Sequence, residues 1–384
     1  MTNNRPVYLD CNATTPLDPR VREVMLYYFD VEYGNEGSRT HEYGTQAKRG
    51  VHMARGIVAT LVRCEPDEVI FTSGATESNN LALLGLAAEG ERTGRRHLIS
   101  TQIEHKAVLE PLRELERRGF QVELLPPNAD GWVEPEKVIE ALRPDTLLVS
   151  VMHANNETGV RQPITEIAEV LKGHPAYFHT DAAQTFGKVV DELQNPRIDL
   201  ISISGHKIYG PKGVGALITR RRGYDRMPLA PLMFGGGQER GLRPGTLPVP
   251  LIAALGKAAE LAGQEWRERA ANCLAFKQEL LAAFEPYHPV IHGDPERTLS
   301  HVLNLSFPGI DSEALMVALK SEVAISNGSA CTSASYRPSY VLEAMGQAPE
   351  DIRCAVRWSW GFGMEANRVN RLMEPLSRLV DLKA

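Results

Sequence analysis

The sequence predicts an α/β protein whose main domain is built on a mostly parallel β-sheet and is followed by a smaller α/β domain. Three observations support this fold class. A short apolar run, a turn of small residues and a helical pattern recur several times in that order. This order stops near residue 251, where a long helical stretch begins. The chain has 384 residues, 43% of them hydrophobic, which is enough for more than one core.

The first part of the chain alternates strands with turns and helices. Each apolar run ends in small or polar residues such as Gly, Ser, Thr, Asn or Asp. Strands that alternate with helices form mostly parallel sheets, and ligands of such sheets bind beyond the carboxyl ends of the strands. The polar residues of these segments fall at those ends, so we expect a site there. The segments are 68–90, 97–119, 146–173, 176–189 and 199–221.

The C-terminal part of the chain has a different pattern. Residues 251–284 follow a helical pattern over their whole length. Residues 300–325 then have the order strand, helix, strand. We therefore expect a smaller C-terminal α/β domain that begins near residue 260.

Composition and cysteine usage narrow the classes of function. A net charge of -6 and an isoelectric point near 6.0 argue against a broad nucleic-acid-binding surface. No apolar stretch suits a signal peptide or a membrane span, so we expect a soluble cytoplasmic protein. The cysteines are scattered and form no CxxC pair, which disfavours a disulfide framework and a metal site. They are Cys11, Cys64, Cys273, Cys331 and Cys354.

Cys331 differs from the other four cysteines in its surroundings. It lies in "SNGSACTSAS", a run of tiny and hydroxylated residues that buries little surface. The other four cysteines are interpreted as small core residues. We therefore expect that Cys331 has a chemical rather than a packing role.

A turn of small residues follows the first apolar run. In "VIFTSGATESNN" the strand ends, Ser73 to Ala75 turn, and a helix begins, with Thr76 adding a hydroxyl. Small residues at a helix N-terminus leave backbone N–H groups free to bind an anion such as phosphate. A plain helix cap explains the same residues equally well.

A lysine and an aspartate stand at two other strand ends. Lys207 follows a strand in the glycine-rich "SISGHKIYGPKG", where a lowered pKa would suit it to form a Schiff base. Asp181 follows the apolar run "AYFHT", so a buried carboxylate in need of a partner is expected. Taken singly, a surface lysine and a solvated turn aspartate are equally good explanations.

The combination is much more specific than its parts. Pyridoxal phosphate needs a lysine for its aldehyde, a carboxylate for its pyridine nitrogen and an anion site for its phosphate. His105, at a further strand end, could stack on the ring or move a proton, although a structural histidine is the alternative. Asn156 and Gln184 could donate hydrogen bonds to the phenolic oxygen of the ring.

Taken together, the motifs resemble those of a known family. The segments "YLDCNATTPLDPRV", "FTSGATESNN", "EHKAVL", "MHANNETGV", "HTDAAQTFGK", "SGHKIYGPKGVGAL", "GGGQERGLRPGT" and "NGSACTSAS" resemble cysteine desulfurases of the nitrogen-fixation and iron–sulfur-cluster type. These are pyridoxal-phosphate enzymes of fold type I, related to class V aminotransferases. The resemblance implies a large domain, 16–260, with a mostly parallel seven-stranded sheet. It also implies a small domain formed by 1–15 and 261–384, which carries the catalytic cysteine.

The resemblance implies a role for each matching residue. Lys207 would be the Schiff-base lysine, Asp181 would pair with the pyridine nitrogen, and His105 would stack on the ring. Asn156 and Gln184 would contact the phenolic oxygen. The residues implied for the phosphate are Ala75, Thr76, Ser204 and His206, together with Thr246, which would reach the phosphate of the other protomer of a homodimer.

The substrate and the sulfur carrier follow from the same resemblance. Arg357 would hold the carboxylate of L-cysteine, and Asn35 would assist it. Cys331 would attack the substrate sulfur, so that L-alanine is released and a persulfide stays on Cys331. The persulfide would pass to an acceptor protein, with no direct contact to nucleic acid and no membrane. Two alternatives remain: a class V aminotransferase, and a non-catalytic sulfur carrier or assembly protein.

Some motifs depart from the housekeeping iron–sulfur enzyme. This chain has "SNGSAC", "MFGGGQERG" and "RPGT" where that enzyme has "SSGSAC", "MHGGGHERG" and "RSGT". "GNEGSRTHEYG" and "QERGLRPGT" are similar to the desulfurase of the DNA phosphorothioation system. We therefore expect the acceptor to be either an iron–sulfur scaffold or a DNA-modification protein.

Overall fold

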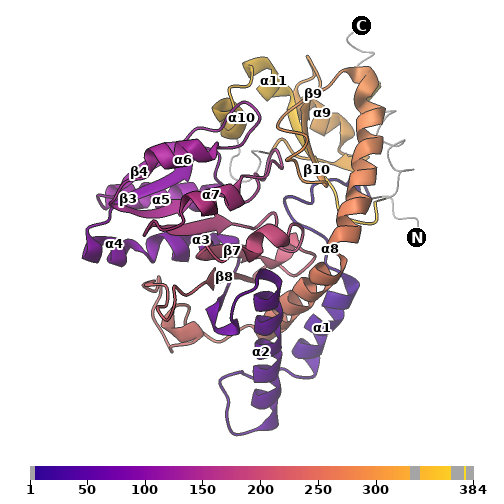
Figure 1. Ribbon diagram of the computed structural model, residues 1–384. Helices are drawn as coiled ribbons and strands as arrows, with labels where there is room; N and C mark the ends of the chain where they lie inside the picture. Colours follow the sequence, from indigo (N-terminus) through magenta and orange to yellow (C-terminus); the bar gives the residue numbers. More distant parts are fainter. Residues whose placement is uncertain (1–4, 329–337, 365–375, 378–384) are drawn as a thin grey trace.

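A seven-stranded sheet forms the centre of the computed structural model, which describes residues 5–328, 338–364, 376 and 377 (Figure 1). In spatial order its strands are β2 (Val69–Thr72), β8 (Gly215–Thr219), β7 (Leu200–Ser204), β6 (Tyr177–Asp181), β5 (Thr146–Ser150), β3 (His97–Thr101) and β4 (Gln121–Leu125). Strand β8 is antiparallel to its neighbours β2 and β7, and the other pairs are parallel. The predicted α/β class with a mostly parallel seven-stranded sheet is confirmed.

Helices cover both faces of this sheet. Successive strand residues point to opposite faces, so Val69 and Phe71 contribute to one core while Ile70 contributes to the other. The first face is covered by α1 (Pro19–Asp30), α2 (Glu42–Val62), α6 (Pro135–Ala141), α7 (Ile164–Val170) and the start of α8 (Val249–Phe284). The second face is covered by α3 (Ala75–Leu84), α4 (Ala87–Thr93) and α5 (Lys106–Arg117).

A second, smaller core lies beside the large sheet. It is built on an antiparallel sheet of β12 (Ala355–Ser359), β10 (Val302–Ser306) and β9 (Val290–Ile291). The N-terminal strand β1 (Val7–Tyr8) pairs in parallel with β11 (Val323–Ala324). The helices of this part are α9 (Ser312–Leu319), α10 (Tyr340–Ala344) and α11 (Pro349–Cys354). The predicted order of strand, helix and strand in residues 300–325 is therefore confirmed.

Helix α8 connects the two cores. It runs without a break through residue 260, where the sequence predicts the domain boundary. Residues near its start, such as Ile252 and Leu255, pack in the large core, whereas Phe276 and Leu280 pack in the small one. The domain limits stay a prediction, because one continuous helix is shared by both cores.

The remaining helices are short. They are 3-10 turns at η1 (Pro66–Glu68), η2 (Asp191–Gln194), η3 (Gly205–Lys207), η4 (Glu239–Gly241) and η5 (Glu285–Tyr287). Within the described part of the chain, none of the helices has both the length and the apolar character needed to span a bilayer.

Candidate active site

Two neighbouring strands and one helix bring the predicted site residues to the same edge of the large sheet. Strand β6 ends at Asp181 and pairs with β7, which ends at Ser204 and leads through η3 to Lys207. The turn after β2 leads into α3, which packs against β7 and β8. A Cβ at Gly215 would lie 2.6 Å from the Cα of Gly74, so β8 can approach this turn only because that position is glycine.

The N-terminus of α3 has the features of an anion site. Gly74 caps the helix with a φ of 152°, a conformation that side chains disfavour. The first N–H groups of a helix have no partner within it, and here they belong to Ala75 and Thr76. Thr76 is exposed, while Ser204 is buried with its Oγ 3.7 Å from where a Cβ of Gly74 would stand. Three of the five residues implied for the phosphate, Ala75, Thr76 and Ser204, therefore surround one turn.

Asp181 is fixed by two donors at the end of β6. Its Oδ2 accepts from Nδ2 of Asn79 at 2.6 Å, and its Oδ1 accepts from the backbone N–H of Ala183 at 2.9 Å. Asp181 is 6% exposed, and Asn79 is fully buried in α3. Because both oxygens are held, the carboxylate has a defined direction. Sequence reasoning missed Asn79, although it stands inside the "SGATESNN" motif.

His105 caps helix α5. Its Nδ1 accepts from the backbone N–H of Ala107 at 3.1 Å, so in the neutral ring the proton lies on Nε2. Burial lowers the pKa of His105, the charge of Asp181 opposes this shift, and the charge of Lys207 adds to it. A neutral ring with a fixed orientation suits the stacking role expected from the sequence.

Lys207 contacts the N-terminal segment. Its Nζ donates to the backbone oxygen of Asn12 and, at 3.0 Å, to that of Ala13. The oxygen of Asn12 also accepts from Nε2 of Gln184 at 3.1 Å. Asn12 therefore connects two of the predicted cofactor residues, Lys207 and Gln184. Sequence reasoning missed Asn12, although the polar run "DCNATT" that follows the apolar "VYL" is a signal that could have pointed to it.

The side chain of Asn12 extends this network toward Arg357. Its Nδ2 donates to the backbone oxygen of Asn156 at 3.1 Å. The same oxygen accepts from NH1 of Arg357 at 2.9 Å. NH2 of Arg357 forms an ion pair with Oδ1 of Asp10 at 2.6 Å. Arg357 is 3% exposed, so its guanidinium is held in place by Asp10 and Asn156.

His206 contacts the N-terminal segment. Its Nδ1 lies 3.1 Å from Oγ1 of Thr14, and its backbone oxygen accepts from the backbone N–H of Thr15 at 2.9 Å. Burial, together with the charge of Lys207, lowers the pKa of His206 to about 4. The ring is neutral at physiological pH, so any contact with a phosphate is a neutral hydrogen bond. Its phosphate role stays a prediction.

Three predicted residues lie apart from this network. Asn35 is exposed in the loop between α1 and α2, where its Oδ1 accepts from the N–H of Gly37 at 2.8 Å. In Figure 1 this loop lies at the end of α2 that is remote from the small sheet. Thr246 is also exposed, in the segment before α8. Cys331 lies outside the described residues.

A cavity borders the site on the side of α5. Its volume is about 530 Å³, and His105, Lys106 and Asn156 contribute to its lining. Gly328 and Pro338, described residues that precede and follow Cys331 in the sequence, also line this cavity. His105, which is predicted to stack on the ring, therefore lines the same cavity as Gly328 and Pro338, which precede and follow the predicted nucleophile in the sequence.

The arrangement can be compared with known proteins. The family model for class V aminotransferases matches residues 7–372. The chain belongs to the class V aminotransferase family. The cysteine desulfurase IscS of Anaeromyxobacter dehalogenans is 49% identical over 358 residues, which are 93% of this chain and 88% of that protein.

Solved structures give the same result. DndA from Streptomyces lividans is 53% identical and superposes with a TM-score of 0.82, covering 93% of this chain and 100% of that one. SspA in complex with cysteine is 38% identical with a TM-score of 0.80, covering 92% and 99%. The chain is thus a cysteine desulfurase of the class V aminotransferases, a family that depends on pyridoxal phosphate.

The residues present fit this cofactor. The amide oxygens of Asn12, Asn156 and Gln184 are buried and have no hydrogen-bond partner among the described residues. Buried polar atoms are normally paired, so these atoms mark a place where a polar ligand belongs. The remaining groups that the cofactor needs are the fixed carboxylate of Asp181, the amine of Lys207 and the N–H groups at the start of α3.

Proposed function

We propose that this cysteine desulfurase forms its persulfide on Cys331 and that the residues of the network hold cofactor and substrate. The observation that carries the proposal is the connection of Lys207, Gln184, Asn156 and Arg357 through one residue, Asn12. Binding groups for the aldehyde, the ring oxygen and the substrate carboxylate are thereby held in one frame. The class V family also includes aminotransferases, which transfer an amino group and need no nucleophilic cysteine. The network of Asn12 would serve either reaction. The role of Cys331 therefore distinguishes desulfuration from transamination.

Each residue has a separate task in the proposed reaction. Bound pyridoxal phosphate supplies an electron sink next to the substrate α-carbon. Asp181 would keep the ring nitrogen protonated, and the N-terminus of α3 would bind the phosphate. Lys207 would hold the cofactor aldehyde, and its amine would move the proton of the substrate α-carbon. His105 covers the ring and excludes water.

Arg357 and Cys331 act on the substrate itself. Arg357 binds the carboxylate of L-cysteine, either beside Asp10 or in exchange for it. The thiolate of Cys331 attacks the substrate sulfur, so an S–S bond forms while the C–S bond breaks. The electron pair of the broken bond stays with the carbon, which takes up a proton and leaves as L-alanine. The products are therefore one persulfide and one alanine for each cysteine.

The nucleophile is tested with a matched pair of variants. Cys331→Ala should still bind cofactor and cysteine but should release no alanine and form no persulfide. Cys64→Ser is the control, because burial raises the pKa of the Cys64 thiol to about 12 and makes it a poor nucleophile. The measurements are alanine release and mapping of ³⁵S from labelled cysteine by mass spectrometry. Normal alanine release from Cys331→Ala would contradict the proposal.

We further propose that the enzyme is a homodimer in which Thr246 serves the site of the other protomer. Several large apolar side chains are exposed in this single chain, including Tyr33 at 66% and Phe234 at 89%. Tyr33 stacks on Tyr43, which is also exposed, and adjoining exposed aromatic groups are typical of interaction surfaces. Asn35 lies on the same loop as Tyr33, which would bring it to the partner's site as well.

Mixed dimers test this arrangement. Lys207→Ala and Thr246→Val homodimers should each have low activity. After subunit exchange, each mixed dimer would contain one site with an intact lysine and an intact threonine, so activity should recover to about a quarter of wild type. No recovery despite mixed dimers detected by native mass spectrometry would mean that Thr246 acts within its own protomer or not at all.

For the acceptor, we propose a DNA-modification protein, and we place the enzyme in the cytoplasm, where thiols stay reduced. The motifs "GNEGSRTHEYG" and "RPGT" support this assignment. Deleting the gene should remove phosphorothioate linkages from the DNA of a host that makes them, as measured by nuclease digestion and mass spectrometry. Unchanged linkages in a host without a second desulfurase would refute it.

A further inference from the structure

A second cavity lies between the two cores, on the other side of the Lys207 turn. Its volume is about 360 Å³, within the range of small-ligand sites. Cys11 and Thr15 from the N-terminal segment, Lys188 from the large domain and Cys273 from α8 line it together with residues near His301. Neither Asp181, His105 nor Arg357 belongs to its lining, so it is distinct from the candidate active site.

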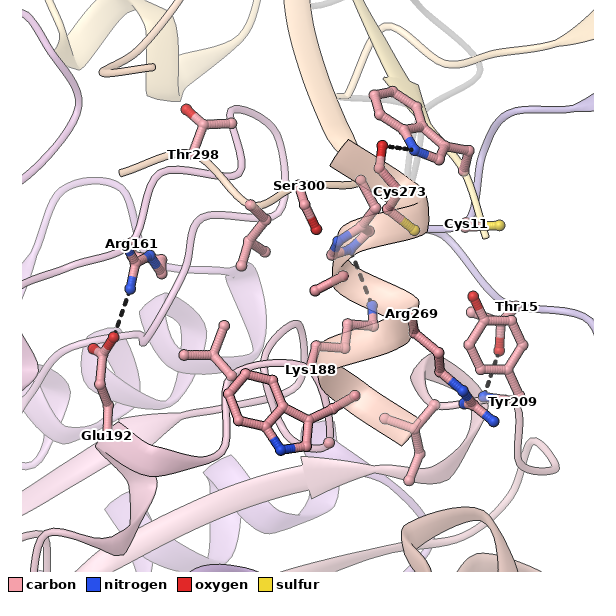
Figure 2. Close-up of a pocket in the computed structure, with 18 of the residues that line it drawn as sticks. Cys11, Thr15, Arg161, Lys188, Glu192, Tyr209, Arg269, Cys273, Thr298 and Ser300 are labelled. Carbon is pink, nitrogen blue, oxygen red and sulfur yellow. Dashed lines mark hydrogen bonds and ion pairs between the residues drawn. The ribbon is translucent and has the colours of Figure 1, made fainter. Parts of the chain in front are cut away.

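Lys188 stands in the middle of this cavity (Figure 2). Its Nζ lies 3.1 Å from Nε2 of His301, the atom to which it donates. Burial, together with the charges of Lys188 and Lys277, holds the pKa of His301 well below its usual value. The histidine is therefore neutral and accepts a hydrogen bond, but it offers no negative charge.

The two thiols do not balance the charge either. Burial raises the pKa of Cys11 to about 12 and that of Cys273 to about 11. Both are neutral thiols at physiological pH. Burial lowers the pKa of Lys188 to about 8, so this side chain remains mostly protonated at pH 7. The cavity thus contains an ammonium group beside three neutral neighbours.

The other cations of the wall already have carboxylate partners. Arg161 pairs with Glu192 at 2.6 Å on one side of the cavity (Figure 2). Arg269, on the other side, pairs with Glu265 at 2.7 Å. Within the described part of the chain, no carboxylate lies within ion-pair distance of Lys188. Lys188 is only partly exposed, and a charge so placed without a counter-charge is costly; an anionic ligand would reduce that cost.

The rest of the lining determines what kind of anion fits. Apolar and aromatic side chains, among them Leu299, Tyr209 and Trp360, form much of the wall. A phosphate would need more than one cation, whereas a single carboxylate matches one ammonium. We propose that this cavity is a second ligand site, which binds a small organic monocarboxylate with its carboxylate on Lys188 and its apolar body against the aromatic wall.

The site shares a wall with the turn that carries the catalytic lysine. Ile208 and Tyr209 directly follow Lys207 and both line the cavity. Tyr209 has a φ of 65°, and its N–H donates to Oγ1 of Thr15, which lines the cavity as well. A ligand on Lys188 would therefore contact the back of the Lys207 turn without entering the active site.

The first test is chemical protection of Lys188 in the cofactor-loaded protein. Benzoate serves as the probe and uncharged benzamide as its control of equal size. Acetic anhydride labels accessible amines, and mass spectrometry follows each lysine. Benzoate should slow labelling of Lys188 at least about fivefold, and benzamide should not. Lys277, also buried with a pKa lowered to about 8 but outside the lining, should label at an unchanged rate.

The second test uses variants and calorimetry. Lys188→Met keeps the volume and removes the charge, so the dissociation constant of benzoate should rise at least about tenfold. Arg357→Gln removes the carboxylate-binding residue of the active site and should leave the protection of Lys188 unchanged. Equal protection by benzamide, equal protection of Lys277, or loss of protection in Arg357→Gln would each overturn the proposal.

Discussion

Replacing Glu104 by Gln should stabilise the protein at neutral pH and should change how stability depends on pH. Glu104 is fully buried next to His105. Its Oε1 accepts from the N–H of Met152 at 2.7 Å and from Oγ1 of Thr101 at 3.0 Å, while Oε2 has no partner among the described residues. Burial raises the pKa of Glu104 to about 8, from an ordinary value of 4.5.

The sign of the effect follows from proton binding. Between pH 4.5 and 8 the folded protein keeps the proton of Glu104, whereas the unfolded chain has lost it. The wild type therefore loses stability as the pH rises through this window. Each pH unit corresponds to about 1.4 kcal/mol, so raising the pH from about 5.5 to about 7.5 should cost the wild type roughly 2 to 3 kcal/mol through this group. Gln keeps the accepting oxygen and has no proton to lose.

The assay is guanidinium unfolding of wild type and Glu104→Gln at both pH values. Any loss of stability that the Gln amide causes by itself is the same at both pH values, so it cancels when the two pH values are compared. The free energy of unfolding of the variant relative to wild type should therefore rise by roughly 2 to 3 kcal/mol between the lower and the higher pH. A relative stability that is the same at both pH values would show that Glu104 is ionised in the folded protein and would refute the reasoning.

Three further changes have expected outcomes. Lys277→Met should raise the free energy of unfolding, measured in urea, by about 2 kcal/mol below pH 8, because burial lowers the pKa of Lys277 to about 8. This gain in stability should vanish as the pH rises toward 10.5, since Lys277 then becomes neutral in the unfolded chain as well. Asp181→Asn should keep the circular-dichroism spectrum of the wild type but weaken pyridoxal-phosphate binding at least about tenfold in a fluorescence titration. Unchanged binding would show that this carboxylate is not the partner of the ring nitrogen. Glu239→Ala should cost about 3 kcal/mol in guanidinium unfolding, because it leaves Arg55 unpaired and removes the acceptor of the N–H of Phe71; a loss below about 1 kcal/mol would contradict this.

The sequence predicted those site residues that stand directly at strand ends. Asp181 and Lys207 follow buried apolar runs, and parallel strands bring such positions to one edge. The sequence did not reveal Asn79 and Asn12, because their partners are distant along the chain: 102 residues separate Asn79 from Asp181, and 144 separate Asn12 from Asn156. A buried amide has no local pattern that distinguishes it from a helix cap or a turn residue.

Two features of the large sheet could not be predicted from the local sequence pattern either. Strand β4 lies at the edge of the sheet with mostly exposed side chains, so it lacks the buried apolar run by which the other strands were predicted. The antiparallel direction of β8 arises from the short connection between Ser204 and Gly215, which cannot form a crossover. Strand direction is therefore set by the length of a connection rather than by the strand itself.

The position of the N-terminal segment has a consequence for the order in which the enzyme is made. Residues 7–12 are synthesised long before their partners: Asp10 pairs with Arg357, and the N–H of Asn12 donates to Ser359. Each pair is separated by 347 residues along the chain. The large sheet can form during translation, since domains fold as units, but the network around Lys207 closes only after residue 359 has emerged. A chain that stops before residue 357 therefore lacks the contacts of Arg357 with Asp10 and Asn156, even when its large sheet is complete.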